Sequence, residues 1–262
     1  MERQVTWKRL SILCATGIFV VYGGLVASLF YFFRGGVFHD ALLSERTWFA
    51  IRLSLTAATA ATLLSVLVGV PAAYALSRHE FPGKAAIDTM LELPMIVSPA
   101  AIGAMLLIFF NTPAGQWLQG WGLQFVFSPG GVILAQFVIT AGVATRLIKA
   151  ALDEIPRRYE EVARTMGASP AIAFARITLP LCRRGILAAA VLTWAKAVGE
   201  FGATITLAGT MAYRTETLPI AIFMQLSTAN IEGTVSLILI LTTLGFATLF
   251  AVRILSGGRR DA

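Results

Sequence analysis

The segment PRRYEEVARTMGASPAIAFARITLP, residues 156–180, is the longest polar interruption in an otherwise apolar chain. Pro156 follows two acidic residues, a pattern typical of a helix start. Gly167 can take the left-handed conformation that ends a helix, and Ser169-Pro170 is a cap followed by a proline. The sequence therefore predicts two short helices with a corner between them, the second closed by Leu179-Pro180.

The first of these predicted helices is amphipathic. Four apolar side chains recur at i, i+3, i+4 and i+7 and therefore share one helical face: Tyr159, Val162, Ala163 and Met166. Charged residues take the rest of its surface. Amphipathicity alone fits a solvated linker at a membrane surface equally well, so the function of this segment has to be decided by other features.

The composition is that of a polytopic membrane protein. Of 262 residues, 57% are hydrophobic and only 13% are charged, which is about half the charged content of an average soluble domain. The net charge of +7 comes from basic residues at the ends of apolar runs, which indicates a membrane surface and not nucleic acid. Two cysteines, Cys14 and Cys182, form neither a disulfide framework nor a metal-ligand spacing.

Six apolar runs have the length of membrane spans. They cover residues 10–33, 48–76, 91–110, 132–148, 185–209 and 234–255. The first run is too long for the core of a signal peptide, so we expect a retained helix. Pro94 and Pro99 interrupt the third run near its start, which fits either a bend that lines a path or a helix that begins late.

The distribution of basic residues predicts the orientation of these spans. Sixteen of the 21 Lys and Arg residues lie in the N-terminus, the loop around 77–84, the region around 146–184 and the C-terminus. Cytoplasmic segments carry such an excess. We therefore expect both termini and residues 153–180 in the cytoplasm, with 35–48, 111–130 and 210–233 outside.

The sequence lacks the motifs of a catalytic subunit. A phosphate-binding loop would read G-x-x-x-x-G-K-[ST], but the only Gly-Lys pair, Gly83-Lys84, is followed by Ala85 and lacks the upstream glycine. No nucleophile with a base and no paired carboxylates stand out. We therefore expect this chain to be no enzyme and to bind no cofactor itself.

The fifth apolar run carries two ionisable residues, Lys196 and Glu200. Their spacing of four places them on one helix face, where they can pair. Ionisable groups at membrane depth are costly and are functional by default, although a structural ion pair between helices or across a dimer fits equally well. Gly199 and Gly202 flank the acid and permit a bend or close helix approach. These four residues are the candidates for a translocation path or gate.

The spacing within residues 161–180 resembles the cytoplasmic loop of ABC-importer permeases, E-A-A-x3-G-x9-I-x-L-P. The residues that match it are Glu161, Ala163, Gly167, Ile177, Leu179 and Pro180. Val162 stands at the middle Ala position, the one departure from the motif. In that family this loop is a coupling helix that docks on an ATP-hydrolysing subunit. The resemblance implies that Glu161 contacts the ATPase and that Gly167 is the point where the ATPase approaches closely. It also implies that the loop is fixed to the fifth span by Ile177, Leu179 and Pro180.

A second resemblance narrows the family. GEFGATITLAG at 199–209 and RTETLPIAI at 214–222 are similar to permeases of molybdate or tungstate importers, with sulfate/thiosulfate permeases as near relatives. The expected fold is thus an all-α, type I importer permease with six transmembrane helices, a single domain over 1–262. It would comprise an extra helix at 10–33, a core at 48–255 and the coupling loop at 153–180.

The resemblance also implies partners. We expect a homodimer in the cell inner membrane, two ATPase subunits that carry ATP and Mg²⁺, and an extracytoplasmic oxyanion-binding protein. The oxyanion would cross by alternating access. An anion channel or carrier that needs no ATPase is the alternative from another class, but such a protein has no need of the spacing in 161–180.

Overall fold

The computed structural model describes residues 2–122 and 124–257, and all regular structure in these residues is helical. The first half of the chain forms α1 (Glu2–Leu29), α2 (Gly35–Leu43), α3 (Glu45–Arg78), α4 (Lys84–Met90), α5 (Leu93–Ile96), α6 (Pro99–Phe110) and α7 (Pro113–Gln119). The second half forms α8 (Pro129–Asp153), α9 (Arg158–Thr165), α10 (Pro170–Ala173), the π-helix η1 (Phe174–Thr178), α11 (Leu179–Val198), α12 (Gly202–Ala208), α13 (Leu218–Ser227) and α14 (Ile231–Gly257).

The helices confirm the predicted all-α membrane class. Among the described residues, five helical segments are long and apolar enough to cross a membrane: Arg9–Leu29, Glu45–Arg78, Pro129–Asp153, Pro170–Val198 and Ile231–Thr248. A sixth span is formed if the bent pair Lys84–Ile96 and Pro99–Phe110 counts as one.

That bent pair lies where the third span was predicted. The chain bends by 113° between its two halves, because Pro99 has no N–H to continue a helix and disfavours helical backbone before it. Val97 is accordingly extended, and the Ser98 side chain accepts a hydrogen bond from Ala101 N to start α6. The structure thus contains a bend in this run, and its place along a path stays a prediction.

The predicted fifth span, 185–209, is wrong as a continuous helix. Its helix begins earlier, ends at Val198, and is followed after a short break by the separate helix α12. Gly199 caps α11 and Phe201 leaves the helical conformation. A hydropathy pattern does not reveal this break, because the residues on both sides of it remain apolar.

Two of the segments that we expect outside the membrane contain helices. Residues 35–48 form α2 and the start of α3, and residues 210–233 contain α13. Arg46 fastens the second of these segments to α3, since its Nε and Nη2 donate to the two carboxylate oxygens of Glu216 at 2.7 and 2.6 Å. Glu216 is buried, so this bidentate pair fixes the loop before α13.

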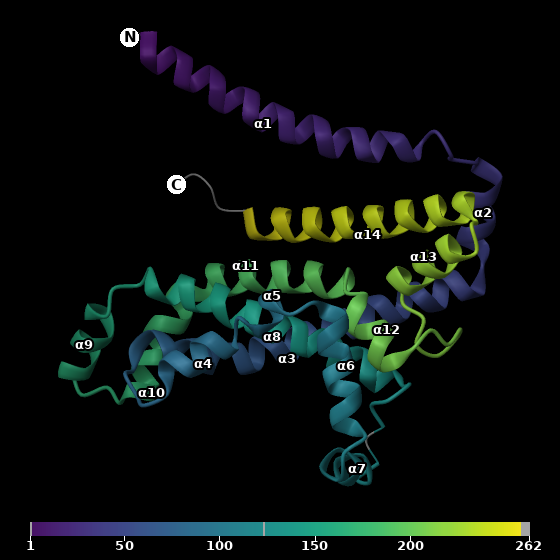
Figure 1. Cartoon of the computed structure of the whole chain (residues 1–262). Helices are drawn as coiled ribbons and strands as arrows, with labels where there is room; N and C mark the ends of the chain where they lie inside the picture. The colour runs from purple at the N-terminus through teal and green to yellow at the C-terminus, as the bar shows by residue number, and fades with distance from the viewer. Residues whose placement is uncertain (1, 123, 258–262) are drawn as a thin grey trace.

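The core forms where α3, α8 and α11 pack together (Figure 1). The residues of α3 that face its neighbours are small, and Ala50, Ala57, Ala58, Ala61 and Ala73 are all buried. Small side chains let helix backbones approach closely, which is how membrane helices associate. By contrast, the side chains of α1 from residue 9 to residue 28 are exposed all along the helix.

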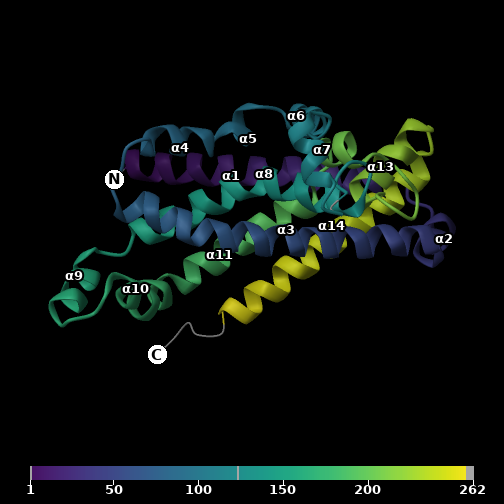
Figure 2. The same ribbon diagram turned by 90° about the horizontal axis from the view of Figure 1, so that it is seen from below.

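The bundle has two distinct ends. In both views α9 and α10 project from one end, while α7 and α13 lie toward the other (Figures 1 and 2). Helix α1 begins and α14 ends on the side where α9 lies (Figure 2). The polar segment at 153–180 therefore lies at the same end of the molecule as the start of α1 and the end of α14.

Candidate functional site

The predicted corner at Gly167 is confirmed. Ala168 N donates to Ala163 O and Gly167 N to Arg164 O, both at 3.0 Å, which is the bond pair of a Schellman motif. Gly167 has φ +91°, in the left-handed region that favours glycine. Helix α9 begins at Arg158, two residues after Pro156. The corner therefore holds α9 at a fixed angle to the next helix.

The second predicted helix does not end at Leu179-Pro180. Ser169 caps α10 by accepting a hydrogen bond from Ile172 N, and the helix then runs through η1 into α11. Leu179 N donates to Phe174 O, five residues back. A proline clashes with the carbonyl four residues before it, and the wide π-turn ahead of Pro180 makes room for that ring. The second short helix is thus continuous with a helix that is long and apolar enough to cross a membrane.

The apolar face of α9 points away from the rest of the chain. Ala163 is buried, but Tyr159, Val162 and Met166 are 54, 50 and 83% exposed. Together with Pro156 and Ile177 they line an open, mostly apolar groove of about 670 Å³. Exposed apolar patches of this kind mark sites of protein–protein or membrane contact.

The side of α9 that carries Glu160 and the buried Ala163 borders the exposed apolar side chains and is tied to the bundle. The Glu160 carboxylate accepts hydrogen bonds from Thr178 Oγ1 at 2.7 Å, Tyr74 Oη at 2.9 Å and Arg78 Nε at 3.0 Å. Burial alone would raise the pKa of Glu160, but these two hydroxyl hydrogen bonds and the charge of Arg78 outweigh it and lower that pKa. Glu160 is therefore ionised at neutral pH.

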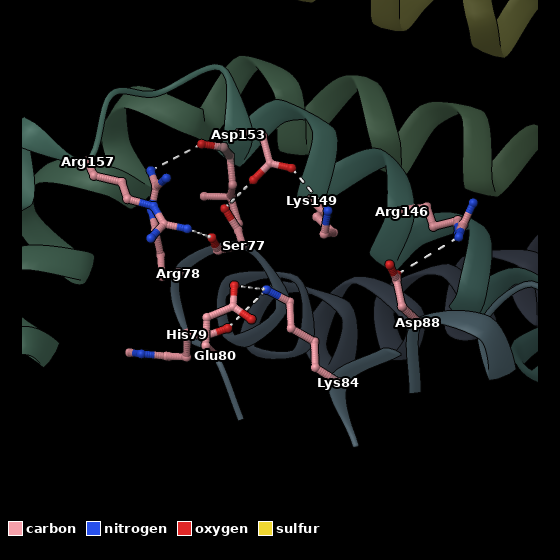
Figure 3. A network of polar contacts seen from close by, with 11 residues as sticks. Ser77, Arg78, His79, Glu80, Lys84, Asp88, Arg146, Lys149, Asp153 and Arg157 are labelled. Carbon is pink, nitrogen blue, oxygen red and sulfur yellow. Dashed lines mark hydrogen bonds and ion pairs between the residues drawn. The ribbon is translucent and has the colours of Figure 1, made fainter. Parts of the chain in front are cut away.

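The end of α3 is joined to the end of α8 by further polar contacts (Figure 3). Arg78 Nη2 donates to the carbonyls of Leu152 and Ile155 at 3.1 and 2.8 Å. Arg157 Nη2 donates to Ser77 O. The Ser77 hydroxyl in turn donates to Asp153, as does Lys149 Nζ. These bonds fix the connection between α8 and α9.

The remaining residues predicted for coupling lie around α9 and the helix that follows it. Glu161 is exposed and, with Arg164, Thr165, Ala168 and Pro170, lines a shallow hollow of about 500 Å³. Ile177 and Leu179 are half-buried, and Pro180 is exposed in the first turn of α11. Glu161 is thus free to meet a partner, whereas its neighbour Glu160 is engaged within the chain.

The four residues predicted for the path do not form the arrangement expected of a continuous helix. Lys196 is exposed in the last turn of α11, whereas Glu200 is buried in the break before α12. Within the described part of the chain they form no ion pair. The two side chains could have paired on one continuous helix, but α11 ends between them. Glu200 instead accepts a hydrogen bond from Ala203 N at 2.9 Å and so caps α12.

The two glycines beside Glu200 differ in their surroundings. A Cβ on Gly202 would lie 2.9 Å from Ala100 N and 3.0 Å from Pro99 Cβ, so α12 and α6 meet there. A Cβ on Gly199 would meet no atom closer than 3.7 Å. Close helix approach is therefore confirmed at Gly202, while Gly199 ends α11.

No group of three or more His, Cys, Asp or Glu side chains in the described residues is placed to hold a metal ion.

Glu160 makes more side-chain hydrogen bonds than any other acid of this site, but no motif in the sequence points to it. Tyr74 and Arg78, which hold it, precede it by more than 80 residues. Two adjacent acids on one amphipathic helix give no local signal that says which one turns toward the bundle. Only Ala163 points to Glu160, because these two residues are three apart and therefore lie on the same side of the helix.

Comparison with known proteins gives a consistent picture. Residues 62–261 match the family model for the inner membrane component of binding-protein-dependent transport systems. The chain is 37% identical to the molybdenum transport permease ModB of Escherichia coli K12 over 195 residues, covering 73% of this chain and 85% of that one. It is 33% identical to a probable molybdenum ABC transporter permease of Haloferax volcanii, covering 95% and 91% of the two chains.

Other relatives carry different substrates in their names. The sulfate permease CysW of Synechocystis is 32% identical over 234 residues, covering 88% of this chain and 85% of that one. Among solved structures, a bacterial alginate ABC transporter superposes with a TM-score of 0.77 at 20% identity, covering 95% and 94% of the chains. The MetNI methionine transporter superposes at 0.61 and 19% identity, covering 83% of this chain and all of that one. These structural matches support the fold.

Proposed function

Since the chain belongs to the family of inner membrane components of binding-protein-dependent transport systems, we propose that it carries a tetrahedral oxyanion, molybdate or tungstate, into the cytoplasm. Family membership makes it a multi-pass permease subunit of an ABC transporter and not the ATP-hydrolysing enzyme. The oxyanion assignment rests on similarity to molybdenum permeases. Sulfate or thiosulfate is the second candidate, favoured by the similarity to CysW.

The observation that carries the coupling proposal is the outward-facing apolar side of α9. Tyr159, Val162 and Met166 are all at least half exposed, and Glu161 is exposed on the same helix, where it lines a separate hollow. An ATPase subunit with a complementary groove would bury these side chains and meet Glu161 with a polar group. Burying a methionine fully contributes about 1.5–3 kcal/mol, so covering these side chains would contribute to the affinity for a partner. ATP and Mg²⁺ would be held by that partner.

The geometry supports a mechanism in which α9 moves together with the membrane helices. Two copies of this chain would present two coupling helices to two ATPase subunits. When ATP closes the ATPase pair, each α9 would be drawn inward and would carry α8 and α11 with it. Rocking of packed helices about a central site is how alternating access proceeds in transporters. A homodimer with both termini in the cytoplasm is part of this proposal.

The path proposal centres on Lys196. Its exposed ammonium lies in the last turn of α11, beside the break that separates this helix from α12. A cation at that place would attract a dianion. Lys196→Ala should reduce uptake at least several-fold while the subunit still accumulates in the membrane. A variant that fails to accumulate would instead assign Lys196 a structural role.

Substrate identity is tested with the reconstituted complex. The permease, its ATPase and its binding protein are placed in liposomes, and the binding protein is loaded in turn with molybdate, tungstate, sulfate or thiosulfate. We expect molybdate and tungstate to stimulate ATP hydrolysis and uptake. Stimulation by sulfate alone would shift the assignment to the second candidate, and anion uptake without ATPase would refute the coupling proposal.

A further inference from the structure

We infer that Glu160 is the positioning residue that transmits movement of α9 to the membrane helices. This inference rests on the proposed coupling function. It assigns adjacent acids of one helix to different tasks: Glu161 faces the partner, and Glu160 holds α9 to its own chain.

The contacts of Glu160 come from two separate membrane helices. Tyr74 and Arg78 lie in the last two turns of α3, and Thr178 is the last residue of η1, directly before α11. One carboxylate therefore joins α9, α3 and the start of α11 through bonds of 2.7 to 3.0 Å. A displacement of α9 must either move both helices or break these bonds.

The pair of Glu160 and Arg78 is shielded from water. Their side chains are only 12 and 6% exposed, respectively, whereas every other ion pair in the described residues has at least one side chain that is 36% or more exposed. Exposed ion pairs contribute little, whereas removing one partner of a buried pair leaves an uncompensated charge and is strongly disruptive. This network therefore resists separation under load in a way that a surface pair does not.

Arg78 extends the same network to α8. Its Nη2 donates to the carbonyls of Leu152 and Ile155 on the connection between α8 and α9. Ser77, which precedes Arg78 at the end of α3, accepts a hydrogen bond from Arg157 Nη2 at its carbonyl oxygen. The cytoplasmic ends of α3, α8 and α11 are thus bound to α9 as one rigid unit. Without the Glu160 carboxylate, α9 keeps its helix and its groove but loses its bonds to α3 and η1.

The matched pair Glu160→Gln and Glu161→Gln tests this division. Each variant is purified with its ATPase and reconstituted, and three quantities are measured: ATPase bound per permease, stimulation of ATP hydrolysis by molybdate-loaded binding protein, and molybdate imported per ATP. We expect Glu160→Gln to keep the ATPase but to lower import per ATP at least about tenfold, because hydrogen bonds to a charged group are lost. We expect Glu161→Gln to weaken ATPase binding instead.

Two outcomes for Glu160→Gln would overturn the inference. One is import per ATP equal to wild type, and the other is loss of the ATPase to the same degree as in Glu161→Gln, which would make Glu160 a docking contact. If Glu160→Gln does not accumulate, Thr178→Val and Tyr74→Phe each remove a single donor. If either of these variants imports at least about threefold less molybdate per ATP, the inference is supported; if both match wild type, it is overturned. Failure of the wild-type chain to bind an ATPase would instead refute the proposed function.

Discussion

The sharpest quantitative prediction concerns Gly167→Ala in the corner after α9. At φ +91° an alanine is strained, and the left-handed conformation costs an L-residue about 1–2 kcal/mol. A Cβ at Gly167 would meet no atom of the chain within 4 Å, so no steric clash is added. If α9 must keep this corner to dock, the strain should weaken ATPase binding about 5- to 30-fold.

The chain offers a matched control in Gly83, between α3 and α4. It has φ +86° and equally open surroundings, so Gly83→Ala adds the same strain outside the coupling loop. The assay is titration of the detergent-purified permease with labelled ATPase. We expect weaker binding for Gly167→Ala and unchanged binding for Gly83→Ala. Equal affinities for Gly167→Ala and wild type, or equal losses in both variants, would refute the reasoning.

Gly167→Asn separates backbone strain from crowding against the partner. Asparagine tolerates the left-handed conformation better than alanine but is larger. If strain alone matters, the asparagine variant binds the ATPase more tightly than the alanine variant. If the partner approaches the corner closely, as the motif resemblance implies, the asparagine variant binds more weakly. Replacing Gly167 by a bulky acidic residue should then abolish uptake, while the variant should still insert into the membrane.

Three further predictions follow from other parts of the structure. Met166→Ser should weaken ATPase binding about 10- to 150-fold in the same titration, because it removes an apolar side chain that docking would bury; unchanged affinity would exclude this face of α9 as the contact. Gly202→Ala should lower the free energy of unfolding of the purified permease by about 1–3 kcal/mol, because the added Cβ crowds Ala100. Gly199→Ala should be tolerated. A larger loss of stability in Gly199→Ala than in Gly202→Ala would contradict the close approach of α12 and α6. Because the pKa of Glu160 is lowered in the folded chain, its stabilising effect should be complete above the ordinary Glu value of about 4.3 and be lost as pH falls through the lowered pKa. The difference in melting temperature between wild type and Glu160→Gln should therefore be constant at neutral pH and shrink in acid, and a difference that grows in acid would contradict this sign.

Local signals in the sequence were sufficient for the coupling loop. The Schellman corner at Gly167 and the capped start at Ser169 depend on residues within one turn, so they follow directly from the sequence. Membrane spans are likewise visible as apolar runs, since a span requires a fixed length of apolar chain. The fold class and the position of α9 were therefore predictable.

Features that depend on distant contacts were not predictable. The break after Val198 leaves hydropathy unchanged, and the Lys196–Glu200 pair was inferred from a helix that does not continue. The inward turn of Glu160 depends on Arg78, 82 residues earlier. The π-turn before Pro180 has no local signal either, because Leu179-Pro180 fits the end of a helix as well as it fits a continuous one.

The measurement that tests the account most directly is molybdate uptake into liposomes that contain the purified permease, with and without its ATPase. We expect one ATPase copy per permease chain, uptake that requires ATP and loaded binding protein, and weaker ATPase binding and uptake when Glu161 or Gly167 is altered. Uptake by the permease alone, without ATP, would contradict it.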